Sequence, residues 1–353
     1  MTDFDLSQID TAISDNQKVV KRDFKKYIRY ILILIVLIAL SFGTYFVYSL
    51  KYRNRPNDIT IGYSQKEDLL LLSLAEHMNF EVSEKELDIR EFDNDEDMLQ
   101  SMKDKKLDLV IIEDISFALT DPNVADLRII SEVASTERYY FLVDIKKGIF
   151  DLTHMIDRSL GIIDSYKTDY WLNVVLSNSG MNEKQLNSIP LKPNKLAQEF
   201  ADANVDGIFA WQPYIYQTEN FEGSEIQVLK IPAQSVTKSY IYLIASQEYI
   251  DSNPDDIKDV LMSMQKAEEY LNTNQDDVIE YLLGEWSTER SYVTEILSDT
   301  SYGIGISSDA KISLKRQYDW GNKKSRLSDT DYRIENAYFY DILKEINPNI
   351  VEF

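Results

Sequence analysis

The pattern of apolar and polar residues divides the chain into two very different parts. Residues 30–50 contain no charged side chain, and about 20 apolar residues, rising 1.5 Å each, cross a bilayer core of roughly 30 Å. Six basic residues precede this run and three follow it closely, which predicts that the N-terminus stays in the cytoplasm. We expect a disordered cytoplasmic tail over residues 1–29, one membrane-spanning helix over 30–50 and a linker over 51–58.

A cleaved signal peptide is the alternative interpretation of this apolar run. Its apolar core would cover residues 31–40, with a small-residue cleavage site at 39–41. The apolar run continues beyond that site, and the preceding tail is long for a signal peptide, so a membrane anchor fits better. The expected location is therefore the inner (cytoplasmic) membrane, crossed once, with the C-terminal part in the periplasm or outside the cell.

Beyond residue 58, strand-like and helix-like segments alternate. Apolar runs typical of strands cover residues 59–63, 87–92, 107–112, 129–133, 138–143, 160–163, 206–211, 225–231 and 240–245. Helical patterns cover residues 66–78, 95–103, 167–178 and 195–203, and after residue 253 the chain is mostly helical, with a last helix near 334–346. This alternation predicts an α/β fold with largely parallel sheets, whose ligand sites lie beyond the carboxyl ends of strands.

Charge and composition narrow the classes of function. The net charge is -23, and residues 1–29 carry six basic and five acidic side chains, so about -24 belongs to the remainder. Such a negative field disfavours nucleic-acid binding. The chain has no cysteine and only two histidines, His77 and His154, which excludes disulfides and thiolate metal sites and disfavours histidine-based catalysis. We expect no cofactor and no metal.

Two stretches carry a resemblance to a known family. Residues 159–163 read SLGII and are followed by SYKT at 165–168, while residues 204–214 read NVDGIFAWQPY and end in Trp-x-Pro-Tyr. In this order and spacing the chain resembles the nitrate, sulfonate and taurine type of ABC-transporter substrate-binding protein, a group that includes pyrimidine-precursor binders. The resemblance extends from about residue 59 to residue 320.

The resemblance implies a bilobal periplasmic-binding-protein-like (type II) fold. Two α/β lobes would be joined by two crossing segments, with a ligand in the cleft between them and closure by hinge motion. Lobe 1 would comprise residues 59–140 and 241–353, and lobe 2 residues 141–240. The crossings would fall near residues 141–144 and 236–242.

The candidate ligand-binding residues follow strands or begin helices. A helix N-terminus presents unpaired N–H groups, so the start of the helix near residue 166 could hold a polar or anionic group, although ordinary helix capping and loop packing would explain the same residues. The candidates are Tyr63, Ser64, Gln65, Asp114, Arg138, Ser165, Tyr166, Lys167, Thr168, Trp211 and Tyr214. A neutral or cationic solute also remains open, with Asp114 and tyrosines as a cation-binding wall.

The sequence predicts a membrane-tethered extracytoplasmic protein that captures a small polar molecule and delivers it to an ABC permease. The alternative is a ligand-sensing or scaffold subunit that uses the same fold beside another integral-membrane partner. An enzyme is disfavoured because no recognisable catalytic motif is present. The acidic run at residues 93–97 lacks the spacing of a calcium loop, and we interpret it as a solvated helix start.

Overall fold

The computed structural model describes residues 58–80, 85–120, 126–223, 225–233, 238–324, 326–327 and 333–352. Residues 59–353 form one compact unit. The expected tail, membrane helix and linker therefore lie outside the described residues, apart from Asp58. Within the described ranges, no helix is both long and apolar enough to span a bilayer.

Lobe 1 is built on a six-stranded sheet in the order β11-β4-β10-β3-β1-β2. Its strands are β1 (Ile59–Tyr63), β2 (Leu87–Glu91), β3 (Leu109–Glu113), β4 (Leu127–Thr136), β10 (Ser239–Ser246) and β11 (Thr300–Gly305). The register pairs Ile61 of β1 with Ile89 of β2 and Leu109 of β3 in parallel. Strand β10 is antiparallel to β3 and β4, and β11 is antiparallel to β4.

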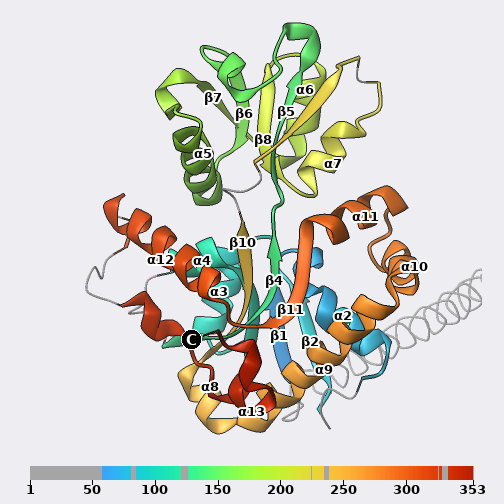
Figure 1. Cartoon of the computed structure of the whole chain (residues 1–353), viewed down its shortest axis with the longest axis vertical. Helices are drawn as coiled ribbons and strands as arrows, with labels where there is room; N and C mark the ends of the chain where they lie inside the picture. The colour runs from blue at the N-terminus through green and yellow to red at the C-terminus, as the bar shows by residue number, and fades with distance from the viewer. Residues whose placement is uncertain are drawn as a thin grey trace, which may run out of the picture. The chain divides into compact units, whose positions relative to one another are not determined.

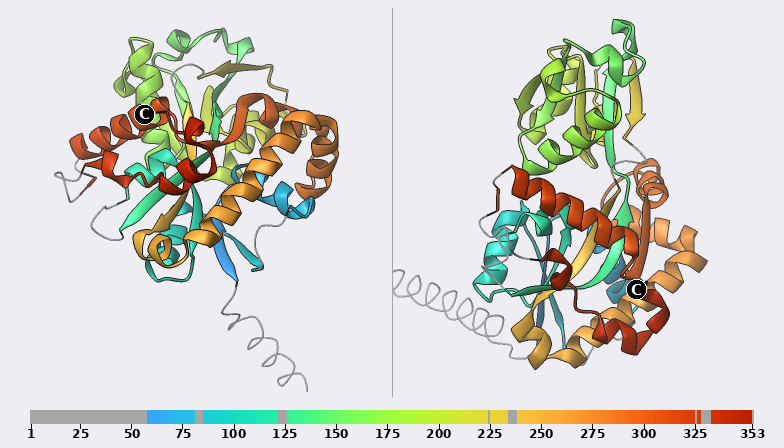
Figure 2. Two further views of the ribbon diagram at one scale, coloured as in Figure 1. Left: turned by 60° about the horizontal axis from the view of Figure 1, so that its bottom comes forward. Right: turned by 60° about the vertical axis from the view of Figure 1, so that its left-hand side comes forward.

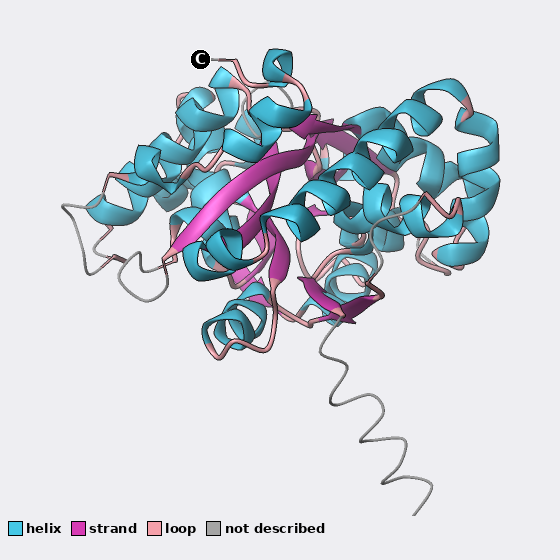
Figure 3. Cartoon of the chain, turned by 90° about the horizontal axis from the view of Figure 1, so that it is seen from below, coloured by secondary structure: helices cyan, strands magenta, loops and turns pink. Residues whose placement is uncertain are grey.

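Helices cover both faces of the lobe 1 sheet, as the view from below shows (Figure 3). They are α2 (Leu70–His77), α3 (Asp95–Lys103), α4 (Asp114–Ala118), α8 (Gln247–Ser252), α9 (Pro254–Thr273), α10 (Gln275–Glu285), α11 (Arg290–Asp299), α12 (Ser308–Lys323) and α13 (Asp341–Ile346). Short 3-10 helices are η1 (Lys66–Leu69), η6 (Ile334–Ala337) and η7 (Pro348–Ile350). The leucines of α2 are buried because this helix packs against α9 over the sheet.

Lobe 2 has its own five-stranded sheet and its own apolar core. The strand order is β7 (Asn187–Leu191), β6 (Ser159–Ile163), β8 (Gly207–Trp211), β5 (Tyr139–Asp144) and β9 (Val228–Pro232). Its helices are α5 (Tyr166–Asn178), α6 (Leu196–Ala201), α7 (Tyr214–Glu219) and the 3-10 helices η2 (Ile145–Lys147), η3 (Leu152–Met155), η4 (Glu183–Gln185) and η5 (Pro193–Lys195). The bulkiest fully buried side chains of this core are Trp171, Tyr139, Phe141, Phe200 and Phe209.

The chain crosses between the two sheets twice, as Figures 1 and 2 show. The first crossing lies between Thr136 of β4 and Tyr139 of β5, and the second between β9 and β10. The first was expected at residues 141–144, which is wrong because these residues are paired with β8 and β9 inside the lobe 2 sheet. The bilobal α/β fold itself is confirmed.

Two details of the expected fold need correction. The sheets are mixed rather than largely parallel, because strands that return from the other lobe, such as β5 and β10, run antiparallel to their neighbours. The C-terminal part also contains β11 and the 16-residue helix α12, neither of which was expected. The helix expected near residues 334–346 is divided into η6 and α13.

Candidate functional site

A cleft of about 430 Å³ lies between the lobes and is lined by both. Lobe 1 contributes residues after β1, the end of β2 and the loop between α10 and α11, and lobe 2 contributes the start of α7. The lining residues are Ser64, Gln65, Lys66, Glu67, Glu91, Pro213, Tyr214, Tyr216, Gln217, Trp286, Ser287, Thr288 and Tyr292. Three predicted site residues, Ser64, Gln65 and Tyr214, are among them.

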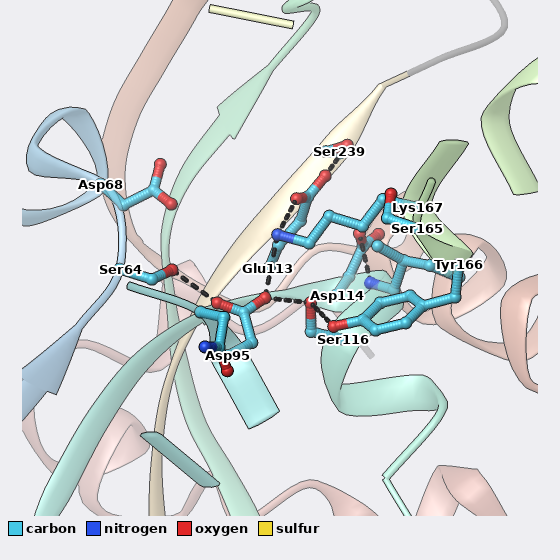
Figure 4. Close-up of polar contacts among 12 residues, drawn as sticks. Ser64, Asp68, Asp95, Glu113, Asp114, Ser116, Ser165, Tyr166, Lys167 and Ser239 are labelled. Carbon is cyan, nitrogen blue, oxygen red and sulfur yellow. Dashed lines mark hydrogen bonds and ion pairs between the residues drawn. The ribbon is translucent and has the colours of Figure 1, made fainter. Parts of the chain in front are cut away.

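Buried charges join the two lobes through Lys167, at the first turn of α5 (Figure 4). The Nζ atom of Lys167 is 2.9 Å from Oδ2 of Asp95 and 3.0 Å from Oε2 of Glu113, both in lobe 1. The Lys167 residue is only 9% exposed, and each carboxylate residue is 3% exposed. A lobe 2 cation is therefore held by two lobe 1 carboxylates away from water.

Arg138, on the first crossing, belongs to the same buried network. Its Nη1 atom is 2.9 Å from Oδ1 of Asp68, and its Nη2 atom is 3.3 Å from Oε2 of Glu113. The residue is 4% exposed. The predicted cations Arg138 and Lys167 are thus brought together, and they share the carboxylate of Glu113.

Hydroxyl groups complete the hydrogen bonding of the buried carboxylates. Ser64 donates to Oδ1 of Asp95 over 2.5 Å, and Ser116 donates to Oδ2 of the same residue. Glu113 accepts from Ser239 over 2.7 Å and from the phenol of Tyr139 over 2.9 Å. Buried carboxylates need such donors, because an unpaired buried charge is strongly destabilising.

The opposite charges in this network keep its carboxylates and its cations ionised at neutral pH. Burial alone would raise the pKa of Glu113, but Lys167 and Arg138 outweigh it and lower the pKa to about 2. The pKa of Asp95 is also lowered, since Lys167 and two serine donors overcome the effect of burial. Burial raises the pKa of Asp68 to about 6, with Arg138 acting in the opposite direction. At neutral pH the network therefore holds three carboxylates and two cations.

Asp114 follows Glu113 of this network and is not among the residues that line the cleft. Its side chain is fully buried, accepts from the backbone N–H of Ile115 over 2.8 Å and accepts from Ser313 of α12 over 3.1 Å. Burial, with Glu113 beside it, raises the pKa of Asp114 to about 8. The sequence predicted that Asp114 would form part of the wall of a ligand site. The hydrogen bonds of its side chain are instead made within lobe 1.

The remaining predicted residues do not line the cleft. Tyr166 donates to Ser116 across the lobes over 3.1 Å, while Ser165 caps α5 by accepting from the N–H of Thr168. Thr168 is fully buried, and Trp211 packs against Tyr139 and Tyr214 at ring distances of 5.7 Å. Tyr63 packs against the lobe 1 core.

Sequence reasoning missed the acidic partners of the two cations. Asp95 was interpreted as part of a solvated helix start, which is wrong because it is buried and paired with Lys167. Asp68 and Glu113 were not singled out, although Glu113 ends an apolar strand where a carboxylate is unusual. Of the described residues, none form a group of three or more acidic or histidine side chains arranged to hold a metal ion.

Comparison with known proteins decides the family. The model of the NMT1/THI5-like family matches residues 80–278, which is more than half of the chain. The chain belongs to the NMT1/THI5-like family. No curated protein sequence matches it.

Solved structures match this family member over nearly their whole length. The periplasmic aliphatic sulphonate-binding protein SsuA from Escherichia coli is 19% identical, with 84% of this chain and 99% of that chain covered and a TM-score of 0.65. The alkanesulfonate-binding protein SsuA from Xanthomonas axonopodis pv. citri, bound to MOPS, is 17% identical, with coverage of 81% and 99% and a TM-score of 0.64. The desulfurization enzyme DSZB is 12% identical, with coverage of 82% and 99% and a TM-score of 0.63. These matches show a fold common to binding proteins and an enzyme.

Proposed function

We propose that this protein is a membrane-tethered extracytoplasmic solute-binding protein that captures a small polar molecule between its lobes and delivers it to an ABC permease. The observation that carries the proposal is the cleft of about 430 Å³ lined by both lobes. This volume is within the range of small-molecule sites, which are usually lined by aromatic rings with a few polar groups. The proteins of similar fold that bind sulfonates support the same class of function.

The connection between the lobes suits a hinge. Two short segments join the sheets (Figure 1). Side-chain contacts between the lobes, such as those of Lys167 and Tyr166, can form and break. Tyr216 of α7, for example, is bonded to Glu289 over 3.1 Å and lies 2.9 Å from the hydroxyl of Ser291. A ligand that touches both lobes would therefore favour the closed form over the open form.

Binding is favoured over catalysis by the chemistry of the cleft. The described lining residues include no histidine, and the chain has no cysteine. His77 stacks on Tyr281 of lobe 1 at 4.1 Å, and His154 lies 3.0 Å from Asp151 in lobe 2, so neither histidine lines the cleft. Similarity of fold to DSZB does not by itself place a catalytic group in this cleft.

The proposed tether rests on the sequence of residues 30–50, which is uncharged and long enough to span a bilayer. Because the chain has no cysteine, it cannot carry a lipid on a cysteine. A membrane helix would keep the binding lobes near a permease in the same membrane.

Thermal unfolding of the purified full chain with a panel of anions, amines and pyrimidines tests the proposed function. A ligand that binds the native state should raise the melting temperature in proportion to the logarithm of its concentration. The change Gln217→Trp, at an exposed cleft position on α7, should block this shift. The matched change Gln100→Trp, on an exposed face of α3 outside the cleft, should keep it. No shift with any compound, or equal shifts in both variants, would contradict the proposal.

A further inference from the structure

We propose that the cleft takes a small organic cation, with a primary amine or a quaternary ammonium group, rather than an anion. This inference rests on the proposed function and adds the chemical class of its ligand. Two observations support it. The two buried cations between the lobes already have carboxylate partners, and the cleft is lined by aromatic rings and a half-buried carboxylate.

The two cations that an anionic ligand would need are already neutralised. Lys167, at the N-terminus of α5, has two carboxylate partners, and Arg138 also has two. Glu113 belongs to both pairs, so three carboxylates face two cations and the buried network carries one net negative charge. A sulfonate or carboxylate entering beside it would meet negative charge instead of a free cation.

The cleft wall combines aromatic rings with a carboxylate. Tyr216 of lobe 2 and Tyr292 of lobe 1 meet across the cleft with ring centres 4.9 Å apart, and Trp286 lies 6.3 Å from Tyr292. Tyr292 donates its hydroxyl to the carboxylate of half-buried Glu67. Aromatic faces and a nearby carboxylate are the chemistry that attracts ammonium groups.

The other charged side chains of the cleft do not change its preference for cations over anions. Lys66 and Glu91 both line it, and both are exposed, so their opposite charges are screened by water and roughly cancel. Glu289, bonded to Tyr216, adds a further negative charge nearby. The half-buried carboxylate of Glu67 therefore determines the preference of the cleft for a cation. A carboxylate accepts several hydrogen bonds, so it can hold an ammonium together with Tyr292.

Isothermal titration of the full chain with choline, putrescine, ethanesulfonate and uracil tests the ligand class. We expect choline or putrescine to bind and ethanesulfonate, an anion without an amine, not to bind. Glu67→Gln should weaken cation binding roughly tenfold, because it removes the charge at the cleft wall. Tyr216→Leu should weaken it by roughly threefold to thirtyfold, because it removes one ring face.

A control variant outside the cleft separates the cation site from general damage. Glu345→Gln removes an exposed carboxylate of α13, which pairs with Lys258, and should change nothing. Binding of ethanesulfonate or uracil in place of both cations would overturn the cation proposal while leaving solute binding intact. Failure of all four probes would also overturn it, and the broader thermal panel would then decide whether the proposed function stands.

Discussion

Asp114 is the first residue of α4, and its fully buried carboxyl group accepts a hydrogen bond from Ser313 of α12. Burial and the charge of Glu113 raise its pKa to about 8, far above the value of 3.8 for a free aspartate. The native state therefore keeps a proton that the unfolded chain releases above pH 3.8. Because the native state binds more protons, the free energy of unfolding falls as pH rises from about 4 to about 8.

Replacing this side chain by its neutral isostere should remove that pH dependence. For Asp114→Asn, the free energy of unfolding relative to wild type should increase by about 1.4 kcal/mol for each pH unit within this window. Urea unfolding at pH 5, 6.5 and 8 measures the difference, with Glu345→Gln as the exposed control. A constant offset between Asp114→Asn and wild type across these pH values would show that Asp114 is already ionised in the native protein.

At the level of single residues, the sequence predicted the cations better than their partners. Lys167 and Arg138 were identified because the helix start and the crossing strand place them at the cleft. Asp68 and Asp95 lie in helices next to other acidic residues, where a sequence pattern does not distinguish a buried carboxylate from a solvated one. Burial of such a group depends on tertiary pairing, which the local pattern does not contain.

At the level of elements, α5 is attached to lobe 1 through Lys167 and Tyr166. Tyr170 of the same helix packs against Trp320 of α12 with ring centres 5.3 Å apart. Figure 1 shows α5 above α12 and α7 above α11. These contacts hold the lobes together without a ligand, so a solute must compete with or add to an existing set of interlobe bonds.

Removing the cation of this network should weaken closure. Lys167→Met leaves Asp95 and Glu113 buried with less compensation, a change that costs about 3–5 kcal/mol in other proteins. We expect a lower melting temperature and, by small-angle X-ray scattering, a larger radius of gyration. Lys192→Met, at an exposed lysine of the same lobe, is the control. Equal melting temperatures and radii for the two variants would show that Lys167 does not hold the lobes together.

Elements with a strong apolar pattern were predictable, and those with a mixed pattern were not. Strand β1 was expected at residues 59–63 and is found there. Strand β11 contains two glycines and few apolar residues, and α12 carries polar residues over most of its surface, so neither pattern was recognised. Their positions are set by packing against β4 and α4, which brings together segments far apart in the sequence.

For the whole molecule, the proposed tether predicts how the chain behaves in cells. With residues 30–50 as a membrane helix, the protein should remain in the membrane fraction after a high-salt wash and should be released by detergent. Its mature form should begin at the original N-terminus. A mature protein that begins near residue 41 and is found in the soluble fraction would establish the signal-peptide alternative instead.

Mass spectrometry of small molecules released from the purified full chain tests solute capture most directly. Wild type and Gln100→Trp should each release the same organic cation in a defined ratio to protein, and Gln217→Trp should release none. If all three preparations release the same compounds in the same amounts, or if wild type releases none after purification from cells and after incubation with the panel, the cleft is not a solute-binding site.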